Sequence, residues 1–323
     1  MSLSERGYTI LSLTLARVRG AFSQRHRGCV SATAWRVGWA FFGAGMGAWV
    51  LTSPASYTPY AGMIGCVTYA FSAGAPLLLI AYLGGRVQAA LPRAVSLTDF
   101  AGWRFGAVGR AWVAAYVCLN VGIALLAEYT TIGALFGPFL GVSPAIAIVV
   151  VGVLTTLYTS LGGLVVSIVT DQVQGAVAAL LLLVIVIYVA VTFRFPLPHP
   201  MPCDPADPMG FCISGENPTG WGSLFSMPAS LATATVFSEA MWQRVWAAES
   251  RRALRVGAWF GFAGVFLGVF ATGLVGLLAA WAGRVGPETD GNLYLFAAFP
   301  DAVSPSGRLR SWIGVVVLTA RSG

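Results

Sequence analysis

Long apolar blocks, bounded by short polar or charged stretches, dominate the sequence. A helix that crosses a bilayer needs about 20 consecutive apolar residues, and seven blocks approach or exceed that length. An eighth block begins at Trp312 and runs to Gly323. The pattern therefore predicts seven transmembrane helices and the start of another. The seven predicted spans cover residues 37–57, 61–84, 111–136, 142–160, 164–193, 222–246 and 256–282.

The composition agrees with this pattern. Hydrophobic residues make up 57% of the 323 residues and charged residues only 10%, whereas a soluble domain is roughly 25% charged. We therefore expect an all-α integral membrane protein whose surroundings are a lipid bilayer. Every one of the 19 basic residues is Arg. The absence of Lys removes the P-loop lysine of a nucleotide-driven pump. The arginines lie mostly between apolar blocks, so the net charge of +7 does not indicate a nucleic-acid partner.

The distribution of arginines orients the predicted helices. Cytoplasmic loops carry an excess of Lys and Arg, and most arginines fall in three groups on one side of the predicted topology. We therefore expect a multi-pass protein of the plasma membrane with a cytoplasmic N-terminus. The three groups precede the first span, follow the second and follow the sixth: Arg6, Arg17, Arg19, Arg25, Arg27 and Arg36; Arg86, Arg93, Arg104 and Arg110; Arg244, Arg251, Arg252 and Arg255.

Two cysteines lie in the loop on the opposite, predicted external side. Cys203 and Cys212 both fall between residues 194 and 220, among loop prolines. Disulfides persist in oxidising compartments, so we expect these two residues to form one. The alternative is a pair of free thiols.

Three carboxylates lie within predicted spans: Glu128, Asp171 and Glu239. A charge in the bilayer costs roughly 2.5 kcal/mol or more, so such residues face the interior of a bundle and usually have a function. Asp171 shares a helical face with Ser167 and Gln174. It lies about 12 Å from the start of its helix, a depth that suits a cation on its way to or from the cytoplasm. The alternative is a structural acid bonded to a neighbouring helix or to an arginine.

Two spans contain breaks. The sixth carries Pro228 before Glu239, and the first passes through Thr52, Ser53 and Pro54. Broken helices are tolerated where their free carbonyls line a cavity, and transporters use them to bind ions and substrates. The two broken spans lie five apart, as in an inverted repeat of five helices, although prolines also occur in membrane helices by chance.

Glu128 shares a face of the third span with Asn120 and Thr131. This acid is interpreted as a protonatable partner or as a group that faces a pore near the outer end of its helix.

Three stretches resemble the sodium:solute symporter family. The most specific is YTSLGGLVVSIVTDQVQG, with Gly-Gly-Leu followed by Thr-Asp-x-x-Gln. It departs from the family at Val166, where a small residue is usual. The others are MWQRVWAAESRRALR and LPRAVSLTDFAGWRFG. They occur in family order, and the resemblance extends over residues 30 to 320.

The resemblance implies a five-plus-five inverted-repeat transporter that couples Na⁺ to the uptake of a small organic solute by alternating access. It implies Na⁺ as the coupling ion, no other cofactor, and no enzymatic activity. The chain resembles the urea-transporting branch of the family more than the sugar-transporting branch. A proline-like or other small amphipathic solute is the alternative. The metal site or path would involve carbonyls near Trp49 and Thr52 together with Asp171. The solute would contact Ser53, Pro54, Tyr57, Thr235, Ser238 and Glu239.

The same resemblance divides the chain into four parts. A cytoplasmic or interfacial segment covers residues 1–35, the first repeat covers 36–193, an extracellular loop covers 194–220, and a partial second repeat covers 221–323. Thr319 and Ser322 are the only candidate hydroxyl ligands in the incomplete eighth helix. We therefore expect a truncated symporter that binds Na⁺ weakly and does not transport by itself.

The alternatives to a Na⁺-coupled symporter are a membrane enzyme, a non-transporting subunit, a passive channel and a proton-coupled carrier. A membrane enzyme is disfavoured because His26 and His199 both lie outside the spans. A non-transporting sensor or assembly subunit would bind solute without flux. A passive channel would ignore Na⁺, and a proton-coupled carrier that uses Glu128 or Glu239 would respond to pH.

Overall fold

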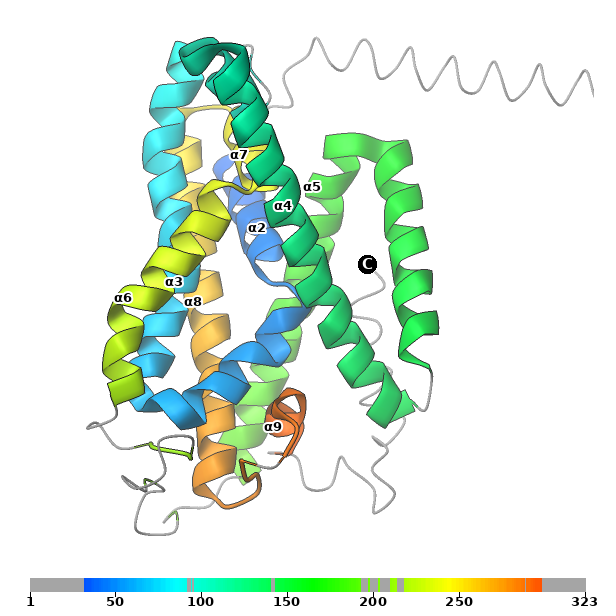
Figure 1. The fold of residues 1–323 in the computed structure, drawn as a ribbon, viewed down its shortest axis with the longest axis vertical. Helices are drawn as coiled ribbons and strands as arrows, with labels where there is room; N and C mark the ends of the chain where they lie inside the picture. The colour runs from blue at the N-terminus through cyan, green and yellow to red at the C-terminus, as the bar shows by residue number, and fades with distance from the viewer. Residues whose placement is uncertain are drawn as a thin grey trace, which may run out of the picture.

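The chain folds into helices, and the described residues contain no β-strand (Figure 1). The computed structural model describes residues 32–91, 94, 96–140, 143–192, 197, 203, 210–213, 218–287 and 289–297. The helices in chain order are α2 (Ala34–Gly45), η1 (Ala48–Leu51), α3 (Ser53–Ala90), α4 (Leu97–Leu140), α5 (Pro144–Thr192), α6 (Pro218–Val236), α7 (Glu239–Ala247), α8 (Arg251–Trp281), η2 (Gly291–Leu293) and α9 (Tyr294–Ala297).

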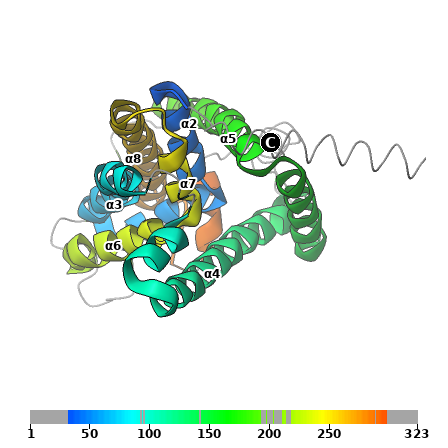
Figure 2. The ribbon, with the colours of Figure 1, turned by 90° about the horizontal axis from the view of Figure 1, so that it is seen from above.

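Three of the long helices change direction within their length. The turn in α3 is at Gly62, with φ 64°, and the turn in α4 is at Gly106, with φ 74°. Glycine adopts this left-handed region without the steric penalty of a Cβ atom. Helix α5 doubles back, so that its two arms lie beside each other in both views (Figures 1 and 2). The apolar stretches of these arms are Pro144–Leu157 and Ser167–Val191.

Among the described residues, four helical segments are long and apolar enough to cross a membrane: Ser53–Ala90, Leu97–Phe136, Ser167–Val191 and Arg251–Trp281. They contain the second, third, fifth and seventh predicted spans for most of their lengths. The fourth predicted span corresponds to the first arm of α5. The first predicted span is divided among α2, η1 and the start of α3, and the sixth is divided between α6 and α7. The architecture is therefore that of a multi-pass membrane protein with two interrupted helices.

The first break follows the sequence prediction, and the second does not. Helix α2 ends at Gly45, and the helical path resumes with η1 and then α3 at Ser53. The sixth span was expected to break at Pro228, which instead lies inside α6. The interruption comes nine residues later, at Phe237 and Ser238. There the indole N–H of Trp242 donates to the carbonyl of Val236 at 2.6 Å, which satisfies an acceptor that the break would otherwise leave free.

Helices α3 and α8 pack against each other, with α6 against α3 and α2 against α8 (Figure 1). The hydroxyl of Thr58, fully buried, donates to the carbonyl of Gly273 at 2.6 Å. Gly276 lies directly against the backbone of Ala55, because a Cβ there would stand 2.6 Å from the Ala55 carbonyl carbon. Small residues therefore allow the two backbones to approach closely.

The described residues of the predicted external loop contact α3 and α9. Cys203 and Cys212 form a disulfide, and the amide of Cys212 donates to the carbonyl of Pro59 at 3.0 Å. The ring of Phe211 lies 5.0 Å from that of Tyr60 and 5.8 Å from that of Tyr294. The described part of the predicted external loop is therefore anchored to the lower arm of α3 and to α9.

Several predictions concern residues outside the described ranges. These are nearly all of the N-terminal segment 1–35 and the eighth helix from Trp312, with Thr319 and Ser322. The division into a first repeat, an extracellular loop and a partial second repeat stays a prediction.

Ser250 caps α8, and its removal should lower stability modestly. Its hydroxyl accepts from the amide of Ala253 at 3.0 Å, which satisfies one of the free donors of the first turn. We expect Ser250→Ala to lower the free energy of unfolding by about 1 kcal/mol, measured by equilibrium unfolding in mixed detergent micelles. Ser250→Asp, which preserves a capping acceptor, should retain most of the stability. Equal losses in the two variants would contradict a capping role.

Candidate functional site

The two interrupted helices meet where α7 ends and α2 begins, and the backbones of Ala32 and Ala248 form a parallel bridge there. The amide of Ala32, just before α2, donates to the carbonyl of Ala247 at 2.8 Å, and the amide of Glu249 donates to the carbonyl of Ala32 at 3.1 Å. Val50 near the first break and Trp242 after the second belong to one buried apolar cluster. The end of α7 therefore lies beside the start of α2.

Asp171 and Arg244 form an ion pair at this junction. The guanidinium Nη2 of Arg244 in α7 donates to Oδ2 of Asp171 in α5, and Nη1 donates to the carbonyl of Ala240 at 2.5 Å. Asp171 is 8% exposed and Arg244 is 3% exposed. The carbonyl of Asp171 abuts Gly43 in the last turn of α2, where any Cβ would clash. The pair therefore ties α5 to α7 beside the end of α2.

This pairing changes the interpretation of both residues. Asp171 was predicted to meet either a passing cation or a neighbouring residue, and in the structure it meets the neighbouring residue. Arg244 was counted among the arginines that flank the spans, but it lies inside the bundle. The reason is electrostatic: a buried carboxylate requires a nearby opposite charge. Asp171 and Arg244 both fall within predicted spans, and two opposite charges inside the membrane could have indicated that they form a pair.

The predicted sodium ligands Trp49 and Thr52 lie in one turn at the first break. The carbonyl of Trp49 accepts from the amide of Thr52 at 3.1 Å and from its hydroxyl at 3.4 Å. The carbonyl of Thr52 accepts from the amide of Ser56 at 2.9 Å. The carbonyl of Thr52 retains a second lone pair and could face a hard cation, whereas both lone pairs of the Trp49 carbonyl accept hydrogen bonds from Thr52. The carboxylate of Asp171 is bound by Arg244 and is not directed at this turn.

The predicted solute residues of the first broken helix begin α3. Ser53, Pro54 and Tyr57 occupy its first turns, next to a row of aromatic rings. The ring of Tyr69 stacks on Trp49, with centroids 6.0 Å apart, and meets Tyr57 edge-on at 5.7 Å. The start of α3 therefore offers hydroxyl groups beside an aromatic surface.

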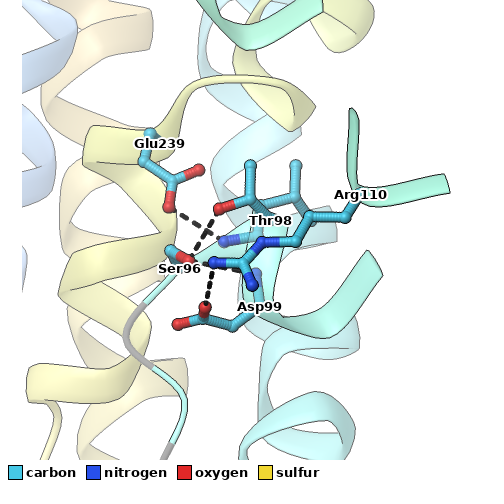
Figure 3. Close-up of polar contacts among 6 residues, drawn as sticks. Ser96, Thr98, Asp99, Arg110 and Glu239 are labelled. Carbon is cyan, nitrogen blue, oxygen red and sulfur yellow. Dashed lines mark hydrogen bonds and ion pairs between the residues drawn. The ribbon is translucent and has the colours of Figure 1, made fainter. Parts of the chain in front are cut away.

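The predicted solute residues of the sixth span lie elsewhere, at the second break. Oε1 of Glu239 accepts from the amide of Leu97 at 2.9 Å, which attaches α7 to the first turn of α4. Thr235 donates its hydroxyl to the carbonyl of Leu231 at 2.7 Å, and Ser238 precedes α7 as its N-cap residue. Figure 3 shows Glu239 directed at this turn of α4, beside the hydroxyls of Ser96 and Thr98 and the ion pair of Asp99 and Arg110 at 3.6 Å.

The structure does not bring these two groups of residues together. The part of α6 that packs beside the start of α3 is its N-terminal end, where Gly220 contacts Ala61 and Ile64. The fifteen residues from Gly220 to Thr235 extend about 22 Å along a helix. Thr235, Ser238 and Glu239 therefore lie towards the arginine-rich end, away from Tyr57.

Glu128 of α4 contacts the first break. The sequence predicted only a protonatable or pore-facing group near the outer end of its helix and did not predict this contact. Its Oε2 accepts from the amide of Ala48 at 2.7 Å, and its Oε1 lies against Gly47, where a Cβ would clash with it. The contact joins residues 80 positions apart. The helical periodicity of α4 placed Glu128 on a face with Thr131, but it carried no information about the partner.

The chain is similar to known transporters in sequence and in fold. A model of the sodium:solute symporter family matches residues 27–281. A spermidine transporter of Candida albicans is 26% identical over 243 residues, which cover 75% of this chain and 45% of that relative. The chain thus spans less than half the length of this curated relative. A solved structure of a Na⁺-coupled sialic acid symporter, in a substrate-bound outward-open state, is similar with a TM-score of 0.65 and 17% identity. That likeness covers 98% of this chain and 70% of the other and concerns the fold.

Proposed function

Because the chain belongs to the sodium:solute symporter family, we propose that it functions in Na⁺-coupled symport of a small organic solute by alternating access. The observation that carries this proposal is the presence of two interrupted helices, α2–α3 and α6–α7, with the ion pair of Asp171 and Arg244 buried between α5 and α7. Interrupted helices supply carbonyl oxygens and helix ends at the depth where transporters bind ions and solutes.

The ion pair suggests how the ion and the protein would interact. A Na⁺ ion that leaves the carbonyls near Trp49 and Thr52 for the cytoplasm would pass the carboxylate of Asp171 and compete there with Arg244. Exchange between a guanidinium and a cation keeps the buried carboxylate neutralised throughout, although the displaced guanidinium of Arg244 would then need water or another partner. In this proposal the pair opens and closes the ion's path on the arginine-rich side.

The fold supports a five-plus-five arrangement as part of the proposal. The two interruptions, between α2 and α3 and between α6 and α7, fall in predicted spans five apart, as two repeats of five helices would place them. Residues 36–193 would form the first repeat and residues 221–323 part of the second. The side with the arginines would face the cytoplasm of a plasma membrane, with the disulfide of Cys203 and Cys212 outside.

The identity of the solute is proposed at the level of its class. A urea-like or a proline-like molecule fits the hydroxyls of Ser53 and Tyr57 beside Pro54, with Thr235, Ser238 and Glu239 on the inner part of the route. The relative from Candida albicans, a spermidine transporter, adds a cationic amine to these candidates.

Transport by the full chain in proteoliposomes tests the proposal. Labelled urea, proline and spermidine are each offered outside, with an inward Na⁺ gradient or with choline in place of Na⁺. The proposal predicts accumulation of at least one solute only with the Na⁺ gradient, and such accumulation would contradict the expectation that this chain does not transport by itself. Uptake that ignores Na⁺ would favour a passive channel, and uptake that follows a pH gradient would favour proton coupling. Solute binding without any flux would instead support a non-transporting sensor or assembly subunit.

A further inference from the structure

Three exposed arginines lie where the end of α3 packs against the start of α8. Arg86 is near the end of α3, and Arg251 and Arg255 are in the first turns of α8. The two helices touch here, because a Cβ on Gly85 would stand 3.6 Å from Cγ of Arg251. Arg251 and Arg255 are four residues apart and therefore share a face of α8. We call the three arginines the α3–α8 arginine surface.

The charge of this surface is not balanced by a carboxylate. Among the described residues, no acid lies within ion-pair distance of the three guanidinium groups. The nearest acid along the chain is Glu249, which is exposed before α8, so a net positive charge remains. Like charges four residues apart on a helix, such as Arg251 and Arg255, repel each other. A bound anion would offset this repulsion and connect α3 to α8.

A tyrosine holds the guanidinium of Arg86 on the exposed face of α3. Its Nη2 donates to the hydroxyl of Tyr82 at 2.7 Å, and its Cζ lies 4.5 Å from the centre of the Tyr82 ring. The hydrogen bond uses one of the five N–H donors of a guanidinium. Phosphate oxygens accept paired hydrogen bonds from such a planar group. The side chain is therefore oriented for an anion before any ligand binds.

An exposed apolar strip continues from the arginines towards the middle of both helices. Trp259 and Phe262 follow Arg255 by about one and two turns of α8. The ring of Phe262 lies 5.6 Å from that of Trp259 and 6.1 Å from that of Phe71 in α3. Trp259 is 60% exposed and Phe71 is 51% exposed. In a bilayer these rings would contact acyl chains, which a free phosphate ion does not possess.

We propose that the α3–α8 arginine surface binds one anionic phospholipid from the leaflet on the arginine-rich side. The phosphate lies between the two helices, and an acyl chain covers Phe262 and Phe71. Charge complementarity selects an anionic headgroup, because arginines near the membrane surface attract anionic lipids. The apolar strip selects a lipid over a soluble phosphate. This partner lies outside the ion and solute path and goes beyond the proposed transport function.

The position of the lipid would affect α7. A Cβ on Gly84 of α3 would stand 2.7 Å from Cγ1 of Val245 in α7. The side-chain amide of Gln88 donates to the carbonyl of Ala248, directly after α7, at 3.3 Å. The part of α3 that carries Arg86 thus also contacts α7. A lipid that joins α3 to α8 should stabilise the packing around this short helix.

Lipid binding to the purified full chain, measured by native mass spectrometry from detergent, tests this inference. The probes are phosphatidylglycerol and the zwitterionic phosphatidylcholine with identical oleoyl chains. We expect the wild type to bind the first phosphatidylglycerol at least about tenfold more tightly than phosphatidylcholine. Arg251→Gln should weaken phosphatidylglycerol binding about fivefold, and addition of Arg86→Gln should weaken it further. Phosphatidylcholine binding should stay unchanged in both variants.

Arg104→Gln is the matched control, because it removes one arginine from another part of the arginine-rich end. Arg104 is exposed in α4 beside the ring of Phe105, at 5.7 Å, and Figure 2 shows α4 on the opposite side of α7 from α8. This variant should bind both lipids like the wild type. Equal losses in Arg104→Gln and Arg251→Gln would show a general effect of charge and would overturn the site.

Two measurements on the wild type decide the inference even if a variant fails to fold. Equal affinity for phosphatidylglycerol and phosphatidylcholine would reject an anionic lipid. Glycerol 3-phosphate, which has the phosphate without acyl chains, should not displace phosphatidylglycerol at about a hundredfold excess. Displacement would show that a soluble phosphate suffices and would reject the lipid. Neither result depends on Na⁺-driven uptake, so failure of the transport proposal would leave this test intact.

Discussion

Replacement of Arg244 with methionine should lower the free energy of unfolding by about 3–5 kcal/mol, since it leaves the carboxylate of Asp171 buried without its guanidinium. Both side chains are almost fully enclosed, and the pair joins α5 to α7 across 73 residues of sequence. Methionine approximates the volume of the arginine stem, so the loss reports on charge more than on packing. Equilibrium unfolding in mixed micelles measures it.

Two further variants show whether the unpaired charge is the cause. Asp171→Leu combined with Arg244→Met removes both charges and should be more stable than Arg244→Met alone, because no charge then remains buried. Arg110→Met breaks the exposed ion pair between Arg110 and Asp99. The side chain of Arg110 is 61% exposed and that of Asp99 is 33% exposed. That variant should change stability by less than about 1 kcal/mol. A double variant as unstable as the single one would show that packing of the Arg244 stem dominates.

Gly276→Ala should be the most damaging of the small substitutions between α3 and α8, with an expected loss of about 1–3 kcal/mol in the free energy of unfolding. The added methyl group would stand 2.5 Å from Ala55 Cα and 2.6 Å from its carbonyl carbon. Both obstacles are backbone atoms, so no side-chain rotation relieves the overlap and the helices must separate.

Gly122→Ala provides the control within a helix. A Cβ at Gly122 of α4 meets nothing within 4 Å, and alanine is favoured over glycine in a helix by up to about 1 kcal/mol. Gly122→Ala should therefore be neutral or slightly stabilising under the same unfolding conditions. If both alanine variants unfolded like the wild type, close approach of α3 and α8 at Gly276 would not limit their packing.

Sequence patterns predicted the helices well because membrane helices are defined by local composition. The apolar blocks gave the cores of α3, α4, α5 and α8, and the run from Thr52 to Pro54 marked the first break. The second break was misplaced because Pro228 is the strongest local breaker in its span. The break at Ser238 depends instead on non-local contacts, since Glu239 attaches to Leu97 of α4.

The candidate site was harder to predict for the same reason. Asp171 was identified as unusual from its surroundings, but its partner Arg244 lies 73 residues away. Glu128 was given little weight, and its contact with Ala48 spans 80 residues. Periodicity reports which face of a helix a residue occupies. It does not report which distant backbone atom that face will meet.

The short helix α7 is held at both ends and in its middle. Glu239 binds α4, Arg244 binds α5, and the carbonyl of Ala247 binds the residue that precedes α2. Three separate parts of the chain are thus attached to one helix of nine residues. If α7 rotates, it must either move α4, α5 and the start of α2 with it or break the polar contact to each of them. Movements of these helices at this end of the bundle are therefore coupled.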